Sequence, residues 1–519
     1  MNFILLYQTL SHLRTRQVLY QLKYRLVKKK YRDLYCPNEV KCSVLTSFIP
    51  KNKSCSDQVF SFLNLSSSFS SWNDTSNGML WAYNLNYMDW LLQEGMPYEE
   101  GAKWIEKFID ELPQNRIGLD PYPIALRGIN WIKFISLYKE RIDEKRMKRW
   151  NDSLYSQYKL LEKKLEYHLL GNHLLEDAYS LYIASIYFKD ASMYRKASML
   201  LIKELKEQTL MDGAHYEQSP MYHCILLDRL LDCYNISFNN LRFENQSKDV
   251  TTLKNYCVCM LGHLESMLYK DGTYPLFNDS AMGIAPTPTQ LFDYASKLGL
   301  QWNPVPLEDS GYRKMVNPVM EAFVDVGNIT AAYQPGHTHA DTFSYELKID
   351  GEPLVVDTGI STYNKTTRRQ EERGTSAHNT VTVSGRNSSE VWGGFRVGKR
   401  AKVKILKDEK NQIKACHNGF GKRGTHTRSF RMDMDGFHIV DEVNTDKEAY
   451  SYIHLAPGVN VLSVTDNRIV TSLAVISVEG ADNIELQENK ISSEYNVFQP
   501  TIVVTLSFRK RLSYQIVKL

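Results

Sequence analysis

Residues 344–359, SYELKIDGEPLVVDTG, mark a change from helical to strand-like sequence in this chain. Apolar and polar residues alternate on both sides of Asp350-Gly351, and an Asp-Gly pair between two such runs is a strong hairpin signal. The alternation continues in NTVTVSG (379–385), RAKVKIL (400–406), FHIVDEV (437–443), AVISVEG (474–480) and TIVVTLSFRKRLSYQIVKL (501–519). These segments predict an antiparallel β-sandwich over residues 318–519.

The sequence before residue 305 has a different period. Apolar residues recur every three or four positions in WLLQEG (90–95), WIEKFIDEL (104–112), LRGINWIKFISLY (126–138), LLEDAYSLYIASIYF (174–188) and CILLDRLLDCYNI (224–236). Short Gly- or Pro-containing turns separate them, which predicts stacked antiparallel helical hairpins over residues 78–310. A Pro-rich linker is expected at residues 303–311. Residues 1–77 are expected to form a basic helix followed by an irregular extension.

The composition is that of a soluble globular protein with more than one domain. The chain has 519 residues, of which 43% are hydrophobic and 24% charged, so disorder and a collagen-like structure are excluded. The eight cysteines form no CxxC pair, so nothing demands an oxidising compartment. No dinucleotide fingerprint or phosphate loop is present, and no organic cofactor is expected.

The net charge of +4 is concentrated partly in a basic N-terminal segment, at Lys23, Arg25, Lys28, Lys29, Lys30 and Arg32. Such a helix is either a solvated face or a contact with an acidic membrane surface or an anionic polymer. Nucleic acid is not favoured, because no recognised module accompanies the charge. No membrane-spanning run or signal peptide is evident, so a cytoplasmic or membrane-peripheral location is expected, or a periplasmic one if an export signal has been removed.

Potential metal ligands cluster early in the strand-rich region. PGHTHAD (335–341) contains His337 and His339, Asp357 follows in VVDTG, and His378 lies in SAHNT. Imidazole and carboxylate groups are typical zinc ligands, and strands bring such separated ligands together. Alternate residues of a strand share a face, so His337 and His339 can point into the same cleft.

Four polar segments stand out among the expected helices. They are DPYP (120–123), which leads to Arg127, GNHLLE (171–176), DGAHYEQSPMYH (212–223) and FNDS (277–280). Each also has a purely structural explanation: Asn172 as a helix N-cap, Asp212-Gly213 as a turn, and Tyr222 as a core residue.

Taken together and in order, GNHLLE, DGAHYEQSPMYH, GHTHAD, VVDTG and AHNTV closely resemble the heparinase II/III family of polysaccharide lyases. WAYNLNYMDW (81–90) and PYPIALRGINWIK (121–133) extend the resemblance, which covers roughly residues 78–400. The resemblance implies an incomplete α/α toroid followed by an antiparallel β-sandwich, in agreement with the periodicity. It also implies β-elimination at a uronic acid of an anionic polysaccharide.

The resemblance implies roles for individual residues. Asn172, aided by His337, would neutralise the uronate carboxylate and stabilise the enolate-like intermediate. Tyr222 would be the acid and, for same-face elimination, the base, whereas His173 would be the base for the opposite geometry. The expected substrate-binding residues are Arg127, Glu176, Tyr363 and Arg373, with Arg368 as an alternative to Arg373. The expected metal site is a structural zinc ion at His339, Asp357 and His378.

Other readings remain open. The spacing HxHxD at residues 337–341 also occurs in zinc metallohydrolases, but position 342 is Thr where that pattern continues with His. A non-catalytic glycan-binding protein would share the cleft, and a scaffold in polysaccharide assembly would use the basic N-terminus for docking. LLYQTLSHLRTRQVLYQLKYRL (5–26) resembles a subgroup associated with bacterial cell-surface polysaccharide production, so both exopolysaccharide and glycosaminoglycan substrates are expected candidates. The oligomeric state, endo or exo action, and syn or anti elimination stay undetermined by the sequence.

Overall fold

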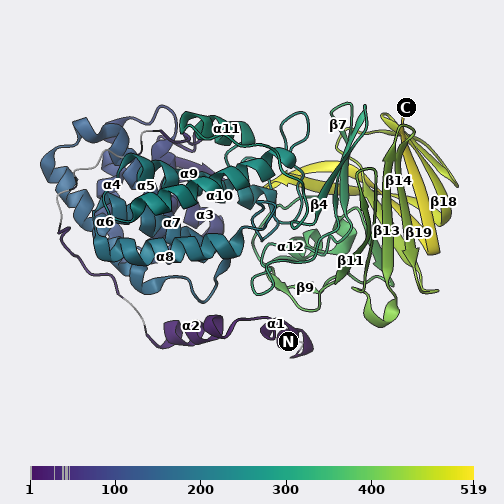
Figure 1. Ribbon diagram of the computed structural model, residues 1–519, viewed down its shortest axis with the longest axis horizontal. Coiled ribbons are helices and arrows are strands. Elements are labelled where there is room, and N and C mark those ends of the chain that lie inside the picture. The colour runs from purple at the N-terminus through teal and green to yellow at the C-terminus, as the bar shows by residue number, and fades with distance from the viewer. Residues whose placement is uncertain (1–2, 28–29, 38–39, 41–44, 46) are drawn as a thin grey trace.

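The computed structural model describes residues 3–27, 30–37, 40, 45 and 47–519, and it divides into a helical half and a strand-rich half (Figure 1). Lys28 and Lys29 of the basic segment and Cys42 lie outside the described residues. The order of elements agrees with the sequence periodicity: a toroid of helices precedes an antiparallel sandwich. None of the helices in the described ranges combines the length and the apolar character that a membrane span requires.

The helices of the toroid are connected by short loops. They are α3 (Met79–Tyr87), α4 (Tyr98–Glu111), α5 (Pro121–Tyr138), α6 (Glu144–Lys164), α7 (Gly171–Tyr187), α8 (Ala191–Gln208), α9 (Pro220–Asn239), α10 (Gln246–Ser266) and α11 (Pro288–Lys297). Helix α7 is central, since it packs on α5, α8 and α9. Every residue of α7 except His173 is buried, so this helix lies inside the toroid.

The extension before α3 is more ordered than its Ser-rich sequence suggests. Three short strands, β1 (Cys55–Ser56), β2 (Val59–Phe62) and β3 (Leu65–Ser68), form an antiparallel sheet. Phe60 and Phe62 alternate with exposed residues and pack on Trp90 and Trp81 of the toroid. The expectation of an irregular extension is therefore wrong here, because two buried aromatic residues give this sheet its contact with the core.

The sandwich consists of two facing sheets and a short helix, α12 (Thr367–Glu372). The smaller sheet contains, in order, β4 (Tyr312–Val316), β5 (Met320–Asp325), β6 (Tyr345–Ile349) and β7 (Glu352–Val355). The larger sheet contains β8 (Val381–Val383), β11 (Val403–Glu409), β12 (Gln412–His417), β13 (His426–Asp433), β14 (Gly436–Val443), β15 (Ala449–His454), β16 (Val461–Thr465), β17 (Arg468–Thr471), β18 (Ala474–Glu494) and β19 (Val497–Lys518). A separate ribbon pairs β9 (Val391–Trp392) with β10 (Arg396–Val397).

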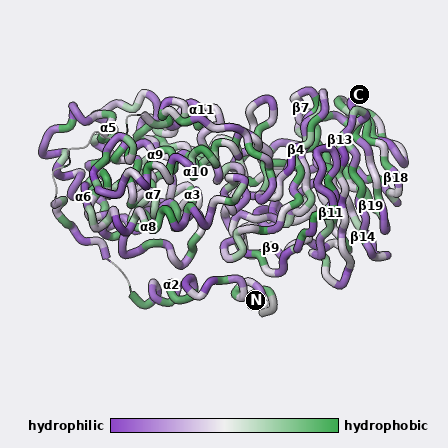
Figure 2. Tube along the Cα trace, in the orientation of Figure 1, coloured by the Kyte–Doolittle hydropathy of each residue, from purple (hydrophilic) through white to green (hydrophobic). Residues whose placement is uncertain are grey.

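Alternation along these strands places one side of each sheet in a shared core. Hydrophobic and hydrophilic residues are interspersed along β13, β14 and β19 (Figure 2). Val324 and Leu347 of the smaller sheet belong to the same buried cluster as Phe430, Ile439 and Ile516 of the larger one. The fold class expected from the sequence, a toroid followed by an antiparallel sandwich, is confirmed.

The hairpin expected at Asp350-Gly351 is confirmed. Ile349 pairs with Glu352 across a two-residue turn, and Asp350 and Gly351 both have positive φ, at 51° and 85°. Positive φ at both central residues is typical of a type I′ turn, whose twist matches that of the two strands it joins. The sandwich begins earlier than residue 318, because β4 already pairs with β5 at Tyr312–Val316. That short strand lacks a clear alternation, since two of its three central residues are only half-buried.

Two segments connect the halves. The tip of the long β18–β19 hairpin reaches back to the toroid, where Ser493 accepts a hydrogen bond from the Met282 amide and the Tyr495 carbonyl accepts one from Asn64. The N-terminal arm, residues 3–27 with α1 (Phe3–Leu10) and α2 (Thr15–Leu26), runs beneath the junction in Figure 1. Both segments lie beside the cleft that the two halves form.

Candidate functional site

A cleft of about 670 Å³ lies at the junction of the toroid and the sandwich. Asn172, His173 and Tyr222 line it from the toroid, and His337 and Tyr363 line it from the sandwich. Its size is that of a small-molecule or oligosaccharide subsite. The structure therefore gathers in one cavity all four of the expected catalytic residues and one of the expected substrate-binding residues.

Asn172 is positioned by Glu217. The Asn172 backbone NH donates to Glu217 Oε1 at 2.9 Å, and its side-chain Nδ2 donates to Oε2 at 2.8 Å. The residue before it, Gly171, has a φ of 61°, and a Cβ there would lie 2.5 Å from Glu217 Oε1. Glycine is thus required for this carboxylate to reach the first turn of α7.

His337 is held between Asn172 and Asp279. Its Nδ1 lies 2.9 Å from Asp279 Oδ2, and its Nε2 lies 3.2 Å from Asn172 Nδ2. Asp279 is fully buried and accepts from both terminal nitrogens of Arg369. Burial alone would raise the pKa of Asp279, but Arg369 and the hydrogen bonds from His337 and His339 hold it well below its usual range. An anionic Asp279 favours the tautomer of His337 that carries its proton on Nδ1.

Tyr222 lies against His337 at the start of α9. Ser219 caps that helix, accepting at its Oγ from the Tyr222 backbone NH, and thereby fixes the first turn. The Tyr222 ring centroid is 3.9 Å from that of His337, and Tyr363 donates to the Tyr222 hydroxyl at 3.2 Å. Burial raises the pKa of Tyr222 above its ordinary value, although Tyr363 opposes the shift. The phenol is therefore protonated at neutral pH and available as a proton donor.

His173 follows Asn172 in the first turn of α7 and also lines the cleft. Its Nδ1 lies 3.1 Å from Glu166 Oε2, and its ring packs on Tyr122 at 4.8 Å between centroids. Burial acts to lower the pKa of His173, but the Glu166 carboxylate outweighs it, so the pKa is raised. A histidine oriented by a carboxylate, with its Nε2 free of protein acceptors among the described residues, can serve as a general base.

Two of the expected substrate-binding residues lie behind the cleft. Arg127 is fully buried and donates to Gln157 and to two backbone carbonyls of the toroid. Glu176 is also fully buried, 3.7 Å from Arg229, and burial raises its pKa to about 7. Neither side chain lines the cleft. Of the two roles that the resemblance implies for Arg127 and Glu176, orienting substrate directly or orienting the groups around it, their burial leaves the indirect one.

Arg373 is likewise a supporting residue. It is fully buried, and its Nε and Nη2 donate to the Thr338 carbonyl, between His337 and His339. Its guanidinium thus shapes the loop that presents His337 rather than the cleft interior. The arginine of α12 that acts on the catalytic residues is Arg369. It donates to Asp279, the carboxylate that holds His337. Arg368 turns away to Glu372.

The expected metal ligands are buried neighbours. His378 Nδ1 lies 2.7 Å from Asp357 Oδ2, and the His339 and His378 rings are 5.2 Å apart between centroids. Within the described ranges no three His, Cys, Asp or Glu side chains are arranged as a preformed metal site. However, His339 Nδ1 and His378 Nε2 are buried and have no hydrogen-bond partner there. The donor types, two imidazoles and a carboxylate, fit a zinc ion.

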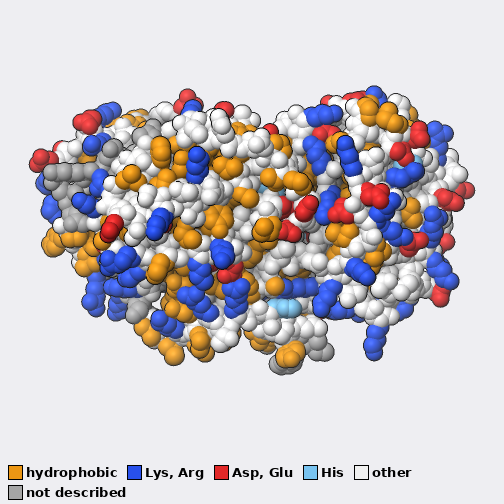
Figure 3. All heavy atoms as spheres, viewed as in Figure 1, with side chains coloured by type: hydrophobic (Ala, Val, Ile, Leu, Met, Phe, Trp, Pro, Cys, Tyr) orange, Lys and Arg blue, Asp and Glu red, His pale blue; other side chains and the backbone are white. Residues whose placement is uncertain are grey.

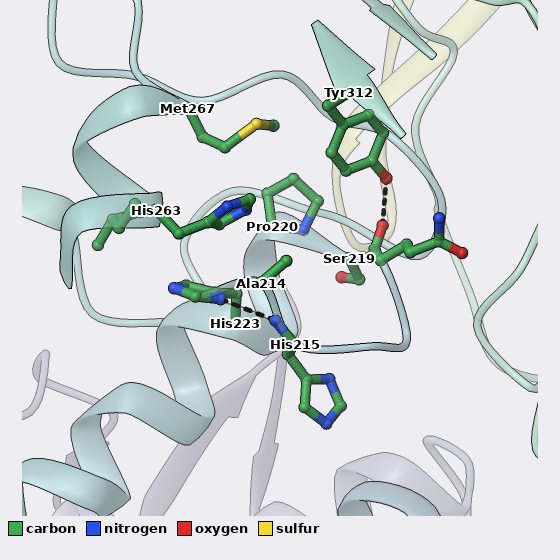
Figure 4. Close-up of a pocket in the computed structure, with 10 residues that line it drawn as sticks. Ala214, His215, Ser219, Pro220, His223, His263, Met267 and Tyr312 are labelled. Carbon is green, nitrogen blue, oxygen red and sulfur yellow. Dashed lines mark hydrogen bonds between the residues drawn. The ribbon is translucent and has the colours of Figure 1, made fainter. Parts of the chain in front are cut away.

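A second, much smaller cavity lies behind the first turn of α9 (Figure 4). Its volume is about 10 Å³, which is near the minimum for one water molecule. His215, His223 and His263 surround it. His223 Nε2 donates to the Met260 carbonyl, so its Nδ1 accepts from the His215 amide, and His263 bonds the Asp212 carbonyl. The rings of His223 and His263 thus bond backbone groups, whereas His215 Nε2 bonds the Gln208 side chain at 3.1 Å.

The residues that orient the site were not identified as functional from the sequence. Glu217 and Asp279 lie in the segments DGAHYEQSPMYH and FNDS, which were singled out without assigning these carboxylates a role. Glu166 and Arg369 gave no signal. Glu217 and Asn172 are 45 residues apart in the chain, and Asp279 and Arg369 are 90 residues apart. No local sequence pattern encodes contacts over such separations.

Two models of known protein families match this chain, one in each half. Residues 129–296 match the model "Heparinase II/III N-terminus", and residues 301–518 match "Heparinase II/III-like, C-terminal". The two matches meet at the linker between the toroid and the sandwich. They include Asn172 and Tyr222 in the first, and His337 in the second.

Similar proteins include two bacterial enzymes named heparin-sulfate lyase. The one from Bacteroides stercoris is 24% identical over 56% of this chain and 46% of its own length, and the one from Pedobacter heparinus is 26% identical over 42% and 36%. This chain thus spans less than half the length of these relatives. A solved structure of heparinase III aligns over 96% of this chain and 89% of its own, with a TM-score of 0.68 and 14% identity, which shows a shared fold.

Proposed function

The chain belongs to the heparinase II/III-like family, and we propose that it is a polysaccharide lyase, a carbon–oxygen lyase that cleaves uronic-acid-containing anionic polysaccharides by β-elimination. The product would carry a 4,5-unsaturated uronate at its new end. The observation that carries the proposal is the convergence of Asn172, His173, Tyr222 and His337 on one cleft. Binding alone would not require this set of acid, base and carboxylate-neutralising groups.

Abstraction of the C5 proton is difficult because the neighbouring carboxylate is anionic. Asn172 Nδ2 and His337 Nε2, 3.2 Å apart, would donate together to that carboxylate in place of their contact with each other, with His337 doubly protonated and its Nδ1 held by Asp279. Both donors would stabilise the negative charge that develops on the carboxylate. Glu217 and Asp279 keep the two donors in place from behind. Since the donors are buried and fixed before substrate binds, little reorganisation is needed in the transition state.

Tyr222 is the proposed acid that protonates the leaving C4 oxygen. Its raised pKa keeps the hydroxyl protonated, and Tyr363 fixes its direction. His173, oriented by Glu166, is the proposed base when the C5 proton and the leaving group lie on opposite faces. For substrates in which they share a face, Tyr222 would take both roles, with the Tyr363 hydrogen bond and the charge of Arg369 favouring the phenolate.

The proposal includes a structural zinc ion held by His339, Asp357 and His378. Its support is the pair of unpartnered buried imidazole nitrogens in this part of the sandwich. When bound, zinc would cross-link the loop that carries His337 and His339 to the segments that follow β7 and precede β8. His337 would not be a ligand of this ion: its Nδ1 is held by Asp279, and its Nε2 can bind the substrate carboxylate when that group replaces Asn172.

The first test is ultraviolet absorbance during incubation with heparan sulfate, hyaluronan, chondroitin, alginate and bacterial exopolysaccharides. Heparan sulfate leads the panel because two relatives are named heparin-sulfate lyases. Elimination creates a double bond conjugated to the carboxylate, which hydrolysis does not. Rising absorbance that Tyr222→Phe abolishes supports the proposal. Binding of a polymer without any rise would instead support a glycan-binding protein.

A further inference from the structure

The N-terminal arm is a fixed part of the cleft wall. On the sandwich side, Trp392 Nε1 donates to Thr9 Oγ1 at 3.1 Å. Gln17 is 1% exposed and contacts both halves, because its Nε2 donates to the carbonyl of Leu169 in the toroid at 3.1 Å and to that of Tyr333 in the β5–β6 loop of the sandwich at 3.3 Å. Because the arm is bonded to both halves, it spans the junction instead of lying free on the surface.

The inner face of the arm forms one end of the cleft. The arm residues that line the cavity together with the catalytic residues are Leu6, Thr9, Leu10, His12, Leu13, Gln17 and Gln21. The face is largely apolar apart from His12 and the two glutamines. Substrate that occupies this end must therefore pass between the arm and the sandwich loops that lie opposite it.

Arg400 of the sandwich lines the same cavity and has no anionic partner. It makes no hydrogen bond or ion pair with any described residue, and its Nε is buried without an acceptor. Other cations of the cleft differ: Lys51 and Arg229 are neutralised by Asp228, at 3.3 and 2.9 Å. Arg396 also lacks an ion pair within the described ranges, but it stacks on Trp392 and is exposed.

His12 brings the arm into this electropositive end. Partial burial lowers its pKa, and the charges of Arg400 and Lys402 lower it further, so His12 lies within electrostatic range of both cations. Among the described residues, no carboxylate opposes this lowering of the His12 pKa. Figure 3 shows Lys and Arg side chains gathered along this lower side of the molecule, near the junction. An anion entering here would gain charge-assisted hydrogen bonds without displacing a protein carboxylate.

We propose that Arg400, with His12 facing it from the arm, binds the carboxylate or sulfate group of an acidic sugar at the arm end of the cleft. The inference rests on the proposed function, and it adds a subsite that selects acidic sugars away from the reacting bond. Arginine suits this role because its planar fork binds carboxylate or sulfate with two parallel hydrogen bonds. The buried, unpartnered Nε is one of the donors that such an acceptor would satisfy.

The test is calorimetric binding in a Tyr222→Phe background, which prevents turnover. The probes are a heparan sulfate tetrasaccharide and an unsulfated hyaluronan tetrasaccharide. Arg400→Gln should weaken binding about tenfold or more, because a charge-assisted contact is lost. The matched control is Lys404→Gln, which removes one positive charge from exposed β11 outside the cleft. It should change affinity less than about twofold. Loss with both probes indicates a bound carboxylate, and loss with the sulfated probe alone indicates a sulfate.

Arg400→Lys keeps the charge but removes the fork, and it should fall between the wild type and Arg400→Gln. Three results would overturn the subsite. Arg400→Gln could bind as tightly as its parent, it could lose no more affinity than Lys404→Gln, or neither probe could bind at all. Wild-type absorbance assays run in parallel report on the proposed function separately. Arg400-dependent binding without double-bond formation would refute the lyase and leave the subsite standing.

Discussion

His337 and Asp279 are joined by a hydrogen bond of 2.9 Å between Nδ1 and Oδ2, although 58 residues separate them in the chain. Asp279 comes from the toroid, whereas His337 comes from the loop between β5 and β6 of the sandwich. The site is therefore assembled by the docking of the two halves. The orientation of His337 depends on a carboxylate that Arg369 keeps ionised.

Replacing Asp279 by Asn should lower kcat roughly 10- to 100-fold, because an amide no longer dictates the tautomer of His337. KM should change much less. The same variant leaves Arg369 buried without a counter-ion, and the free energy of unfolding should fall by about 3–5 kcal/mol in urea titrations. Nitrogen chemical shifts of the His337 ring, measured by NMR, would show the changed hydrogen bond at Nδ1.

The control separates orientation from stability. Asp441→Asn breaks another fully buried ion pair, with Arg428, inside the sandwich. It should cost comparable stability while kcat stays near the wild-type value. If Asp279→Asn kept full kcat, or if Asp441→Asn lost as much, the proposed role of Asp279 in positioning His337 would be refuted.

Tyr222→Phe should lower elimination by about 10²-fold or more while affinity for a substrate oligosaccharide stays within a few-fold. The ring is retained, so its contact with His337 at 3.9 Å persists and only the proton donor is lost. Absorbance kinetics and calorimetry measure the two quantities. Tyr234→Phe, farther along α9 and outside the cleft, is the matched control and should be neutral. Full activity of Tyr222→Phe would remove Tyr222 from the mechanism.

The pH dependence should report on His173. As a base it must be neutral, and its raised pKa places the acidic limb of kcat/KM above about 6.5. Glu166→Gln removes the main group that raises this pKa, so the limb should move to lower pH. The His173–Glu166 interaction also stabilises the folded state at low pH, where His173 is charged. This stabilisation is lost as the pH rises through the raised pKa of His173. Glu162→Gln, outside the cleft, should leave the profile unchanged. An unmoved limb in Glu166→Gln would exclude His173 as the base.

The fold could be predicted because its signals are local. Alternation around Asp350-Gly351 gave the hairpin, and three- and four-residue spacing gave the helices of the toroid. The small sheet β1–β3 escaped because it depends on two buried rings, Phe60 and Phe62, within a Ser-rich sequence. Strands that short acquire their stability from the surface on which they pack.

The site could be predicted in part. Asn172, His173, Tyr222 and His337 belong to motifs, and the structure brings them to one cleft. Burial cannot be judged from a motif: the resemblance placed Arg127 among the residues that bind or orient substrate, yet its guanidinium is fully used by Gln157 and backbone carbonyls. The basic charge of the N-terminal segment suggested a contact with an anionic polymer, but the role of Gln17 could not be predicted, because it acts through carbonyl groups distant in sequence.

Removal of His378 tests the zinc proposal without relying on activity. The purified wild-type protein should contain about one zinc ion per chain by elemental analysis, and His378→Ala should contain none. Chelation should lower the Tm of the wild type, since a bound metal stabilises the folded state, and should not alter that of His378→Ala. His263→Gln, near the small second cavity, is the control and should retain the metal. A metal-free wild type with an unchanged Tm on zinc addition would refute the proposal.

Gln17→Leu should reduce kcat although the side chain is not catalytic. One amide nitrogen donates to Leu169, three residues before Asn172, and to Tyr333, four residues before His337. Leucine keeps the volume but leaves two buried carbonyls unpaired, which costs about 1–3 kcal/mol each. The two segments that carry the carboxylate-binding pair should then lose their fixed spacing. Gln21→Leu is the matched control, because Gln21 lines the cleft from the same helix without a hydrogen bond to either segment.

Hydrogen exchange distinguishes this positioning role from a general loss of stability. Amides of residues 165–175 and 330–340 should exchange faster in Gln17→Leu, while those of β13 and β14 at the far side of the sandwich should not change. kcat should fall about tenfold and KM should move less, because the donors are displaced relative to the transition state and binding elsewhere is retained. The positioning role of Gln17 would be refuted if Gln17→Leu and Gln21→Leu had equal effects on kcat. It would also be refuted if exchange became faster throughout the chain.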